Sequence, residues 1–129
     1  MFQRFPAPPL ARRCWRPSAD CYHTSDGWLL KLELAGVRPE DVQVQHQGRW
    51  LIVAGCRRDI VTTSGARCQS LEISYDLFER RFEFPCDLAD ARITLEFQHG
   101  MLMVLVNRAA PSGCDTELRC GDTEILPRL

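Results

Sequence analysis

The segment between Phe78 and Pro85 most constrains how this chain can fold. Its three phenylalanines share one parity, and glutamate and arginine side chains occupy the other. Successive side chains of a β-strand point to opposite faces, so an extended segment with this sequence has one apolar and one charged face. Pro85 ends the segment because it has no N–H to donate to a sheet. The pattern predicts a half-buried strand and not a helix.

Strand signals continue through most of the chain. The predicted strands, most of them with alternating apolar residues, cover residues 28–34, 42–45, 50–55, 76–84, 93–97 and 101–106. Gly48 and the Gln98-His99-Gly100 sequence predict tight turns. In residues 101–106 both parities are apolar, which indicates burial on both faces or contact with another segment. A short helical turn is expected at residues 87–90. The fold class predicted is all-β, an immunoglobulin-like antiparallel β-sandwich of seven or eight strands.

The chain length allows one domain with two tails. A chain of 129 residues can bury one real core but not two. Four prolines interrupt residues 1–17, and periodicity ends after Arg108, where prolines and glycines are again frequent. We expect a flexible N-terminal arm at 1–17, a sandwich domain at 18–108 and a flexible C-terminal arm at 109–129.

Composition argues against several classes of partner. The formal net charge is −1, which disfavours a dedicated nucleic-acid surface. No apolar run approaches the length of a membrane span, and the N-terminus lacks the apolar core of a signal peptide. We expect a cytoplasmic protein that binds neither nucleic acid nor membrane.

No motif predicts chemistry. The seven cysteines are widely and irregularly spaced, with no C-x-x-C pair, so we expect reduced thiols and no metal site. Glycine-rich phosphate loops, G-x-S-x-G and H-E-x-x-H are all missing, and the three histidines have no matching acid or nucleophile nearby. The sequence therefore predicts neither an enzyme nor a cofactor.

Three motifs in order give a family resemblance. These are Gly36-Val37 with the residues up to Val42, the F-x-R-x-F-x-x-P strand at 78–85, and Gly100-Met101-Leu102. From about Pro17 to Arg108 the chain resembles the small heat-shock protein (α-crystallin) family, in its bacterial and plant branch. The resemblance implies an ATP-independent holdase, a chaperone that binds partly unfolded client proteins and prevents their aggregation.

The linker at 59–75 is too long for a hairpin loop and has a strand-like piece at 69–73. Leu71 and Ile73 share one parity there. The resemblance implies that this piece crosses to a neighbouring subunit and completes its sheet, giving a strand-swapped homodimer. The alternative is a flexible loop with a chance alternation.

The resemblance also implies two contact sites. A groove for a C-terminal arm or a client would lie between Val42 and Val44 on one strand and Ile93 and Leu95 on another, although all four could equally be core residues. Arg80 would form an ion pair across the dimer interface, since a buried guanidinium needs a carboxylate. The alternative for Arg80 is an exposed side chain.

Departures from the family pattern point to a small assembly. Ala35 replaces the usual proline, the N-terminal arm is short, and neither Leu118-Arg119-Cys120 nor the sequence at 125–129 forms a clean I-x-I. We expect a dimer or small oligomer. The alternative function is a co-chaperone-type sandwich adaptor that docks a folded partner.

Overall fold

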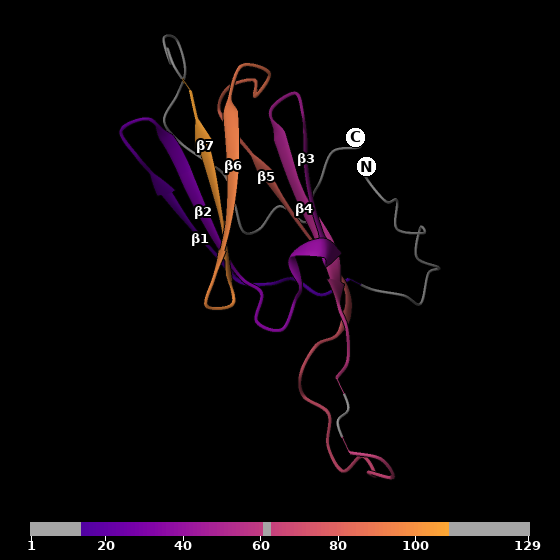
Figure 1. The fold of residues 1–129 in the computed structure, drawn as a ribbon. Coiled ribbons are helices and arrows are strands. Elements are labelled where there is room, and N and C mark those ends of the chain that lie inside the picture. Colours follow the sequence, from indigo (N-terminus) through magenta and orange to yellow (C-terminus); the bar gives the residue numbers. More distant parts are fainter. Residues whose placement is uncertain (1–13, 61–62, 109–129) are drawn as a thin grey trace.

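The structure, a computed structural model, describes residues 14–60 and 63–108. In this part of the chain two antiparallel sheets pack face to face (Figure 1). The four-stranded sheet has the order β1-β2-β7-β6, and the three-stranded sheet has the order β3-β4-β5. The strands are β1 (Ala19–His23), β2 (Gly27–Glu33), β3 (Val42–Gln47), β4 (Trp50–Arg57), β5 (Asp76–Glu83), β6 (Arg92–Gln98) and β7 (Met101–Asn107). The predicted all-β, immunoglobulin-like sandwich is confirmed.

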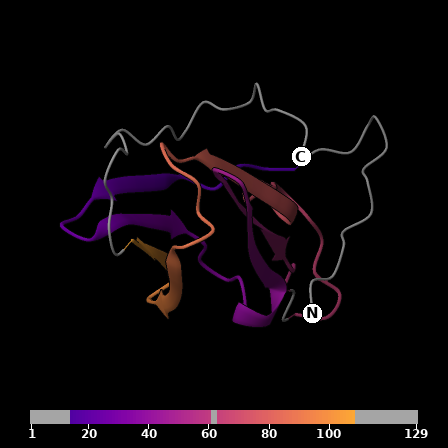
Figure 2. The ribbon, with the colours of Figure 1, turned by 90° about the horizontal axis from the view of Figure 1, so that it is seen from above.

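The core lies between the two sheets, which Figure 2 shows as separate layers. Alternate residues of β2 and β7 face the core. Where these two strands pair, each core-facing residue of β2 lies opposite a buried residue of β7. From the other sheet, Phe78 and Phe82 of β5 and Phe84 directly after it face the core and are buried. Burying one such side chain stabilises the fold by about 1.5–3 kcal/mol. Hydrophobic burial on alternating positions therefore specifies which face of each strand points inward.

Tight turns set the register of two hairpins. His99 and Gly100, between β6 and β7, both have positive φ angles, of 54° and 79°. A two-residue loop with this conformation matches the twist of the flanking strands. Gly48, with φ of 61°, begins the corresponding loop between β3 and β4. Both turns were predicted from the glycines.

Three local features differ from the sequence expectations. The strand β1 was not predicted, because its five residues, Ala-Asp-Cys-Tyr-His, carry little apolar alternation. Residues 87–90 form a turn in which the Ala91 amide donates to the Leu88 carbonyl, not a helix. A short 3₁₀ helix, η1 (Pro39–Asp41), lies between β2 and β3 instead.

The expectation of reduced thiols is wrong for Cys21 and Cys86, because each is disulfide-bonded. Both side chains are partly buried and pack against the hydrophobic core. Sequence spacing carries no information on which sulfur atoms the fold brings close. No helix in the part of the chain that the structure describes is long and apolar enough to cross a membrane.

Candidate interaction surfaces

The connection between β4 and β5 projects away from the sandwich (Figure 1). Its described residues form no strand within this single chain, including the strand-like piece at 69–73. Leu71 and Ile73 are 79% and 63% exposed, and Ile60 at the start of the connection is exposed as well. This connection, residues 58–75, is called the projecting loop below. It presents large apolar side chains to solvent that no other described segment of the chain covers.

One side of the sandwich is crossed by the residues that precede β1. Trp15 forms an isolated bridge with Phe78 of β5, with ring centroids 5.3 Å apart, and β1 begins only four residues later at Ala19. The edge strands β5 and β1 therefore lie on the same side of the two layers. It follows that the other two edge strands, β3 and β6, share the opposite side.

Arg80 of β5 is buried in this crossing. Its side chain is only 5% exposed, its Nη1 donates a hydrogen bond of 2.6 Å to the Pro17 carbonyl, and its guanidinium lies 5.0 Å from the Phe82 ring centroid. Arg80 shares the parity of the phenylalanines, so inward burial follows from the strand period. The alternative of an exposed arginine is wrong, whereas an ion pair across a dimer interface stays a prediction.

The opposite side carries the four residues of the predicted groove. Val42 and Val44 of β3 and Ile93 of β6 are partly buried and pack against the core. Leu95 of β6 is 47% exposed, although its position opposite Val104 places it on the core-facing side of the sheet. Because β6 is an edge strand, the core-facing side of Leu95 is not fully covered. The fold thus puts all four residues on the two edge strands of one side, and their role as a groove stays a prediction.

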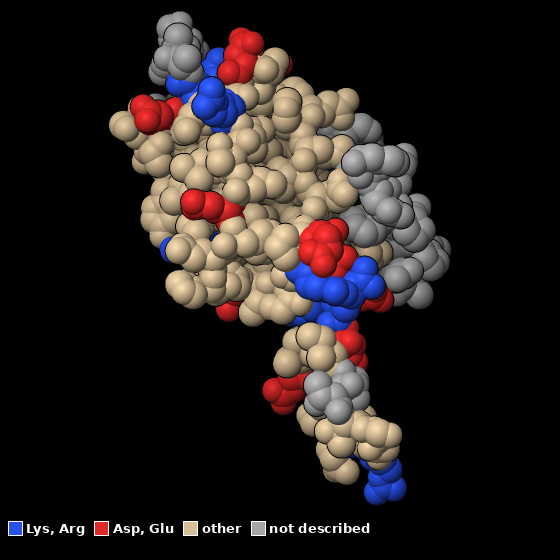
Figure 3. All heavy atoms as spheres, in the orientation of Figure 1, with Lys and Arg blue, Asp and Glu red and all other residues tan. Residues whose placement is uncertain are grey.

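An ion-pair cluster fastens η1 to the end of β4. Arg58 donates from Nε and Nη2 to the two carboxylate oxygens of Asp41, at 2.8 and 2.9 Å, and Arg38 lies 3.6 Å from the same carboxylate. The Asp41 side chain is only 9% exposed. The hydrogen bonds and charge of Arg58 hold the pKa of Asp41 below its usual value, against the opposing effect of burial. Figure 3 shows basic and acidic side chains gathered where the projecting loop leaves the body of the molecule.

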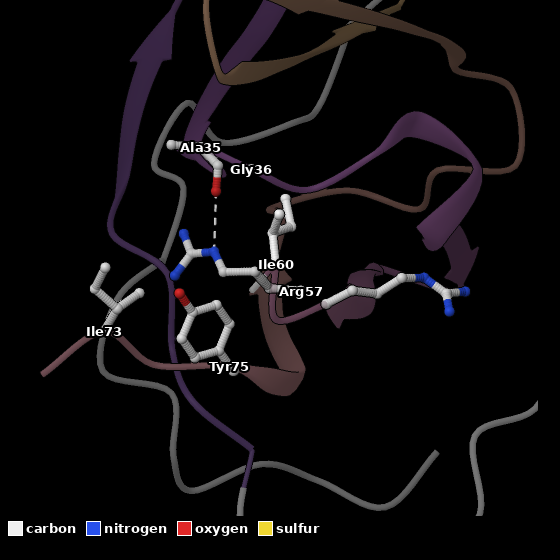
Figure 4. Close-up of a pocket in the computed structure, with 7 residues that line it drawn as sticks. Ala35, Gly36, Arg57, Ile60, Ile73 and Tyr75 are labelled. Carbon is white, nitrogen blue, oxygen red and sulfur yellow. Dashed lines mark hydrogen bonds between the residues drawn. The ribbon is translucent and has the colours of Figure 1, made fainter. Parts of the chain in front are cut away.

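A pocket of about 280 Å³ opens beside this cluster, at the base of the projecting loop (Figure 4). Arg57 crosses it, and its Nε donates to the Ala35 carbonyl at 2.9 Å while its Nη1 donates to the Ser74 carbonyl at 2.8 Å. The lining residues come from the turn after β2, the end of β4 with the start of the projecting loop, and the return of that loop: Ala35, Gly36, Arg57, Arg58, Ile60, Ile73 and Tyr75.

Sequence reasoning missed the open edge strand β1, the Asp41–Arg58 pair and this pocket. The run of acidic residues after Pro39 indicates the start of a helical turn, and that signal could have revealed η1. The pocket joins three segments that are distant in sequence, so no local pattern could have predicted it.

Known proteins resemble this chain in sequence and in fold. The model of the Hsp20/alpha crystallin family matches residues 20–117. Small heat shock protein C2 of Rickettsia felis is 23% identical over 81% of this chain and 68% of its own length. The 16.9 kDa class I heat shock protein 1 of Triticum aestivum is 30% identical over 70% of this chain, which spans only 60% of the wheat protein.

Solved structures agree with this relationship. Heat shock protein 16.0 from Schizosaccharomyces pombe is 29% identical, with a TM-score of 0.66 over 80% of this chain and 96% of that chain. A small heat-shock protein from Xylella fastidiosa, described as having a distinct high order structure, is 27% identical, with a TM-score of 0.63 over 81% of this chain and 97% of that chain. The family match covers most of the sandwich, so the chain belongs to the Hsp20/alpha crystallin family of small heat shock proteins.

Proposed function

We propose that this protein is an ATP-independent holdase that binds partly unfolded proteins and keeps them from aggregating. Membership of the small heat shock proteins implies a chaperone-type function in general. The observation that carries the finer proposal is the contrast between a closed core and apolar side chains that are exposed to solvent outside the exchanged piece 69–73, at Ile60 of the projecting loop and Leu95 of β6. Exposed apolar surface of this kind marks interaction sites on soluble proteins.

The projecting loop also supports a strand-swapped homodimer. Leu71 and Ile73 share one parity, and β1 is an edge strand whose outer N–H and C=O groups have no neighbouring strand among the described residues. An extended segment can add to such an edge through main-chain hydrogen bonds while its alternate side chains fill the adjoining surface. In this proposal residues 69–73 of one subunit pair with β1 of the other. Arg80 lies near that edge and stays a predicted interface residue.

The side formed by β3 and β6 is the proposed groove for a client or a C-terminal arm. Val42, Val44 and Ile93 supply its partly buried wall, and Leu95 supplies an exposed apolar contact. The predicted C-terminal arm, residues 109–129, lies outside the described residues, as does most of the N-terminal arm. A cytoplasmic location and the lack of catalytic activity remain predictions from the sequence.

An aggregation assay tests the holdase proposal. Purified protein at near-stoichiometric ratio should suppress light scattering from a heat- or reduction-sensitive client without added nucleotide. Bovine serum albumin at equal mass serves as the control for non-specific crowding. Unchanged scattering over a range of ratios would contradict the proposal.

The mass in solution distinguishes the holdase from the adaptor alternative. A strand-swapped holdase should sediment as a dimer or small oligomer at micromolar concentration. A monomer that leaves client aggregation unchanged and binds one folded partner would instead favour the co-chaperone-type adaptor.

A further inference from the structure

The strand edge of β1 lies close to the projecting loop of its own chain. Glu33 of β2 donates to the Ser18 carbonyl directly before β1. Ala35, two residues after Glu33, accepts a hydrogen bond from Arg57 at the base of the loop. Two residues of extended chain span about 7 Å, whereas the piece 69–73 extends over about 17 Å. The loop is therefore long enough to reach β1 of its own chain as well as β1 of a second copy.

In the single chain the loop nevertheless stays apart from that edge. It projects away from the sandwich (Figure 1), and its side chains Leu71 and Ile73 are largely exposed. The piece 69–73 forms no strand, and among the described residues β1 pairs only with β2. Because an unpaired strand edge is a template for an extended segment, contacts at the base of the loop must hold the two apart.

Arg57 makes such a contact with the returning limb of the loop. Its Nε donates to the Ala35 carbonyl at 2.9 Å (Figure 4), and its Nη1 donates to the Ser74 carbonyl at 2.8 Å. Its guanidinium also lies 4.2 Å from the ring centroid of Trp15. Between residues 69–75 and the rest of the described chain, the bond to Ser74 is the only hydrogen bond. Arg57 therefore fixes the residue that directly follows the exchanged piece.

The next bend of the backbone is fixed as well. Asp76, the first residue of β5, has a φ of 75°, in the left-handed region that residues with a side chain seldom adopt. The Nε1 of Trp15 donates to the Asp76 carbonyl at 3.2 Å. A backbone conformation of this kind persists only where its surroundings hold it, and such positions are concentrated at functional sites. The bend at Asp76 and the Arg57 hydrogen bond together set the direction in which the loop leaves the sandwich.

We propose that Arg57 is a positioning residue for strand exchange, which keeps the piece 69–73 off β1 of its own chain and presents it to β1 of a second copy. The inference rests on the strand-swapped homodimer proposed above and names the residue that decides between exchange and self-pairing. A piece that is already held in an outward direction loses less freedom when it docks on a partner. Arg58 has a different role, because its two hydrogen bonds to Asp41 hold the outgoing limb of the loop.

Sedimentation of the full chain over a range of concentrations tests the proposal. Arg57→Gln removes the guanidinium that binds Ser74, and we expect the dissociation constant of the dimer to rise at least about tenfold. Arg58→Gln is the matched control at the outgoing limb and should change that constant by less than about threefold. An unchanged constant for Arg57→Gln, or equal rises in the two variants, would overturn the proposal.

Arg57→Lys separates geometry from charge. A lysine keeps the positive charge, but its ammonium group does not reproduce the planar fork that reaches two carbonyls and stacks on Trp15. We expect this variant to weaken the dimer as much as Arg57→Gln does, with the circular dichroism of a β protein retained in both. A lysine variant that dimerises with wild-type affinity would show that charge alone matters, which would overturn the positioning role.

Hydrogen–deuterium exchange locates the piece in the single subunit. At a dilution at which the proteins are monomeric, the wild-type amides at 69–73 should exchange at the rate of an unstructured chain. In Arg57→Gln they should exchange at least about tenfold more slowly, because the released piece pairs with β1 of its own chain. Equally fast exchange at 69–73 in both proteins would contradict the proposal.

The outcomes separate this inference from the proposals that precede it. A wild-type dimer that does not respond to Arg57→Gln overturns the positioning role and leaves strand exchange standing. A wild-type protein that stays monomeric at every concentration overturns both. Suppression of client aggregation is measured separately on the same samples and reports the holdase activity alone.

Discussion

The sandwich core and the projecting loop use similar residues in opposite ways. Phe82 on β5 is completely buried, whereas Leu71, only eleven positions earlier, is 79% exposed. The difference is the presence of an opposing layer: β2 and β7 cover the inner face of β5, while no described segment covers 69–73. Apolar alternation therefore specifies a strand face, but the chain alone does not always supply the surface that buries it.

The largest expected effect comes from the core. Phe82→Ala should lower the free energy of unfolding by about 3–5 kcal/mol, because the removed ring leaves a cavity between the sheets. Urea denaturation followed by tryptophan fluorescence measures the change. Leu71→Ala is the control from the loop and should change the unfolding of a single subunit by less than about 0.5 kcal/mol. Similar losses for both variants would contradict the difference in burial between the core and the projecting loop.

A double substitution in the loop should change assembly instead of folding. Replacing Leu71 and Ile73 together by Asp should convert a dimer to a monomer, since two charges would be forced against a partner's sheet. Sedimentation velocity measures the mass, and circular dichroism should remain that of a β protein. Ser70→Asp, on the other parity of the same piece, should keep the dimer. An unchanged mass in the double variant would exclude the strand-swapping proposal.

Two glycines, one in the core and one in the projecting loop, allow a second test of the difference in packing. A Cβ at Gly55 would overlap the Asp41 carbonyl oxygen and the Phe78 ring, so Gly55→Ala should lower the free energy of unfolding by about 1–3 kcal/mol. Gly65 in the loop has open space around it, and Gly65→Ala meets only the strain of its positive φ, 78°, worth about 1–2 kcal/mol at most. Thermal unfolding of the two variants compares these costs, and a larger loss at Gly65 would contradict the packing argument.

The smallest expected effect is at the ion pair where core and loop meet. Asp41→Asn should lower the free energy of unfolding by about 0.2–1 kcal/mol, because Arg58 remains well exposed to solvent. The pKa of Asp41 is lower in the folded state, so the contribution is complete above the unfolded carboxyl pKa of about 3.9 and is lost as the pH falls through the folded value. Urea midpoints of wild type and variant should differ at pH 6 and converge in strong acid. A difference that persists below both pKa values would indicate a cause other than this carboxylate.

The sequence was sufficient for what depends on periodicity. The alternation of Phe78, Phe82 and Phe84 predicted a half-buried strand, and the glycines at 48 and 100 predicted the hairpin turns. The same parity rule, applied to Arg80, would have predicted its burial. These features depend on neighbouring residues along one strand, which a sequence displays directly.

Features that depend on distant contacts could not be predicted in this way. The strand β1 exists because β2 offers it an edge, and its own five residues carry little signal. The disulfide bonding of Cys21 and Cys86 and the pocket beside Arg57 depend on which segments the fold brings together. The roles of Leu71, Ile73 and the groove residues depend on a second molecule, so both the sequence and a single chain leave them as predictions.

The crossing of residues 14–18 has a consequence for how the sandwich opens. The Trp15 amide donates to the Leu77 carbonyl of β5, and the Trp15 carbonyl accepts from the Glu79 amide of the same strand. The Arg80 guanidinium donates to the Pro17 carbonyl. The Ser18 carbonyl accepts from the Glu33 amide of β2. Separating the two layers on this side requires breaking either the bonds that hold this segment to β5 or the bond that holds it to β2, whereas β3 and β6 share no paired backbone on the other side. We expect deuterium to enter the amides of β3 and β6 before those of β2 and β5, so that local opening starts on the side of the proposed groove.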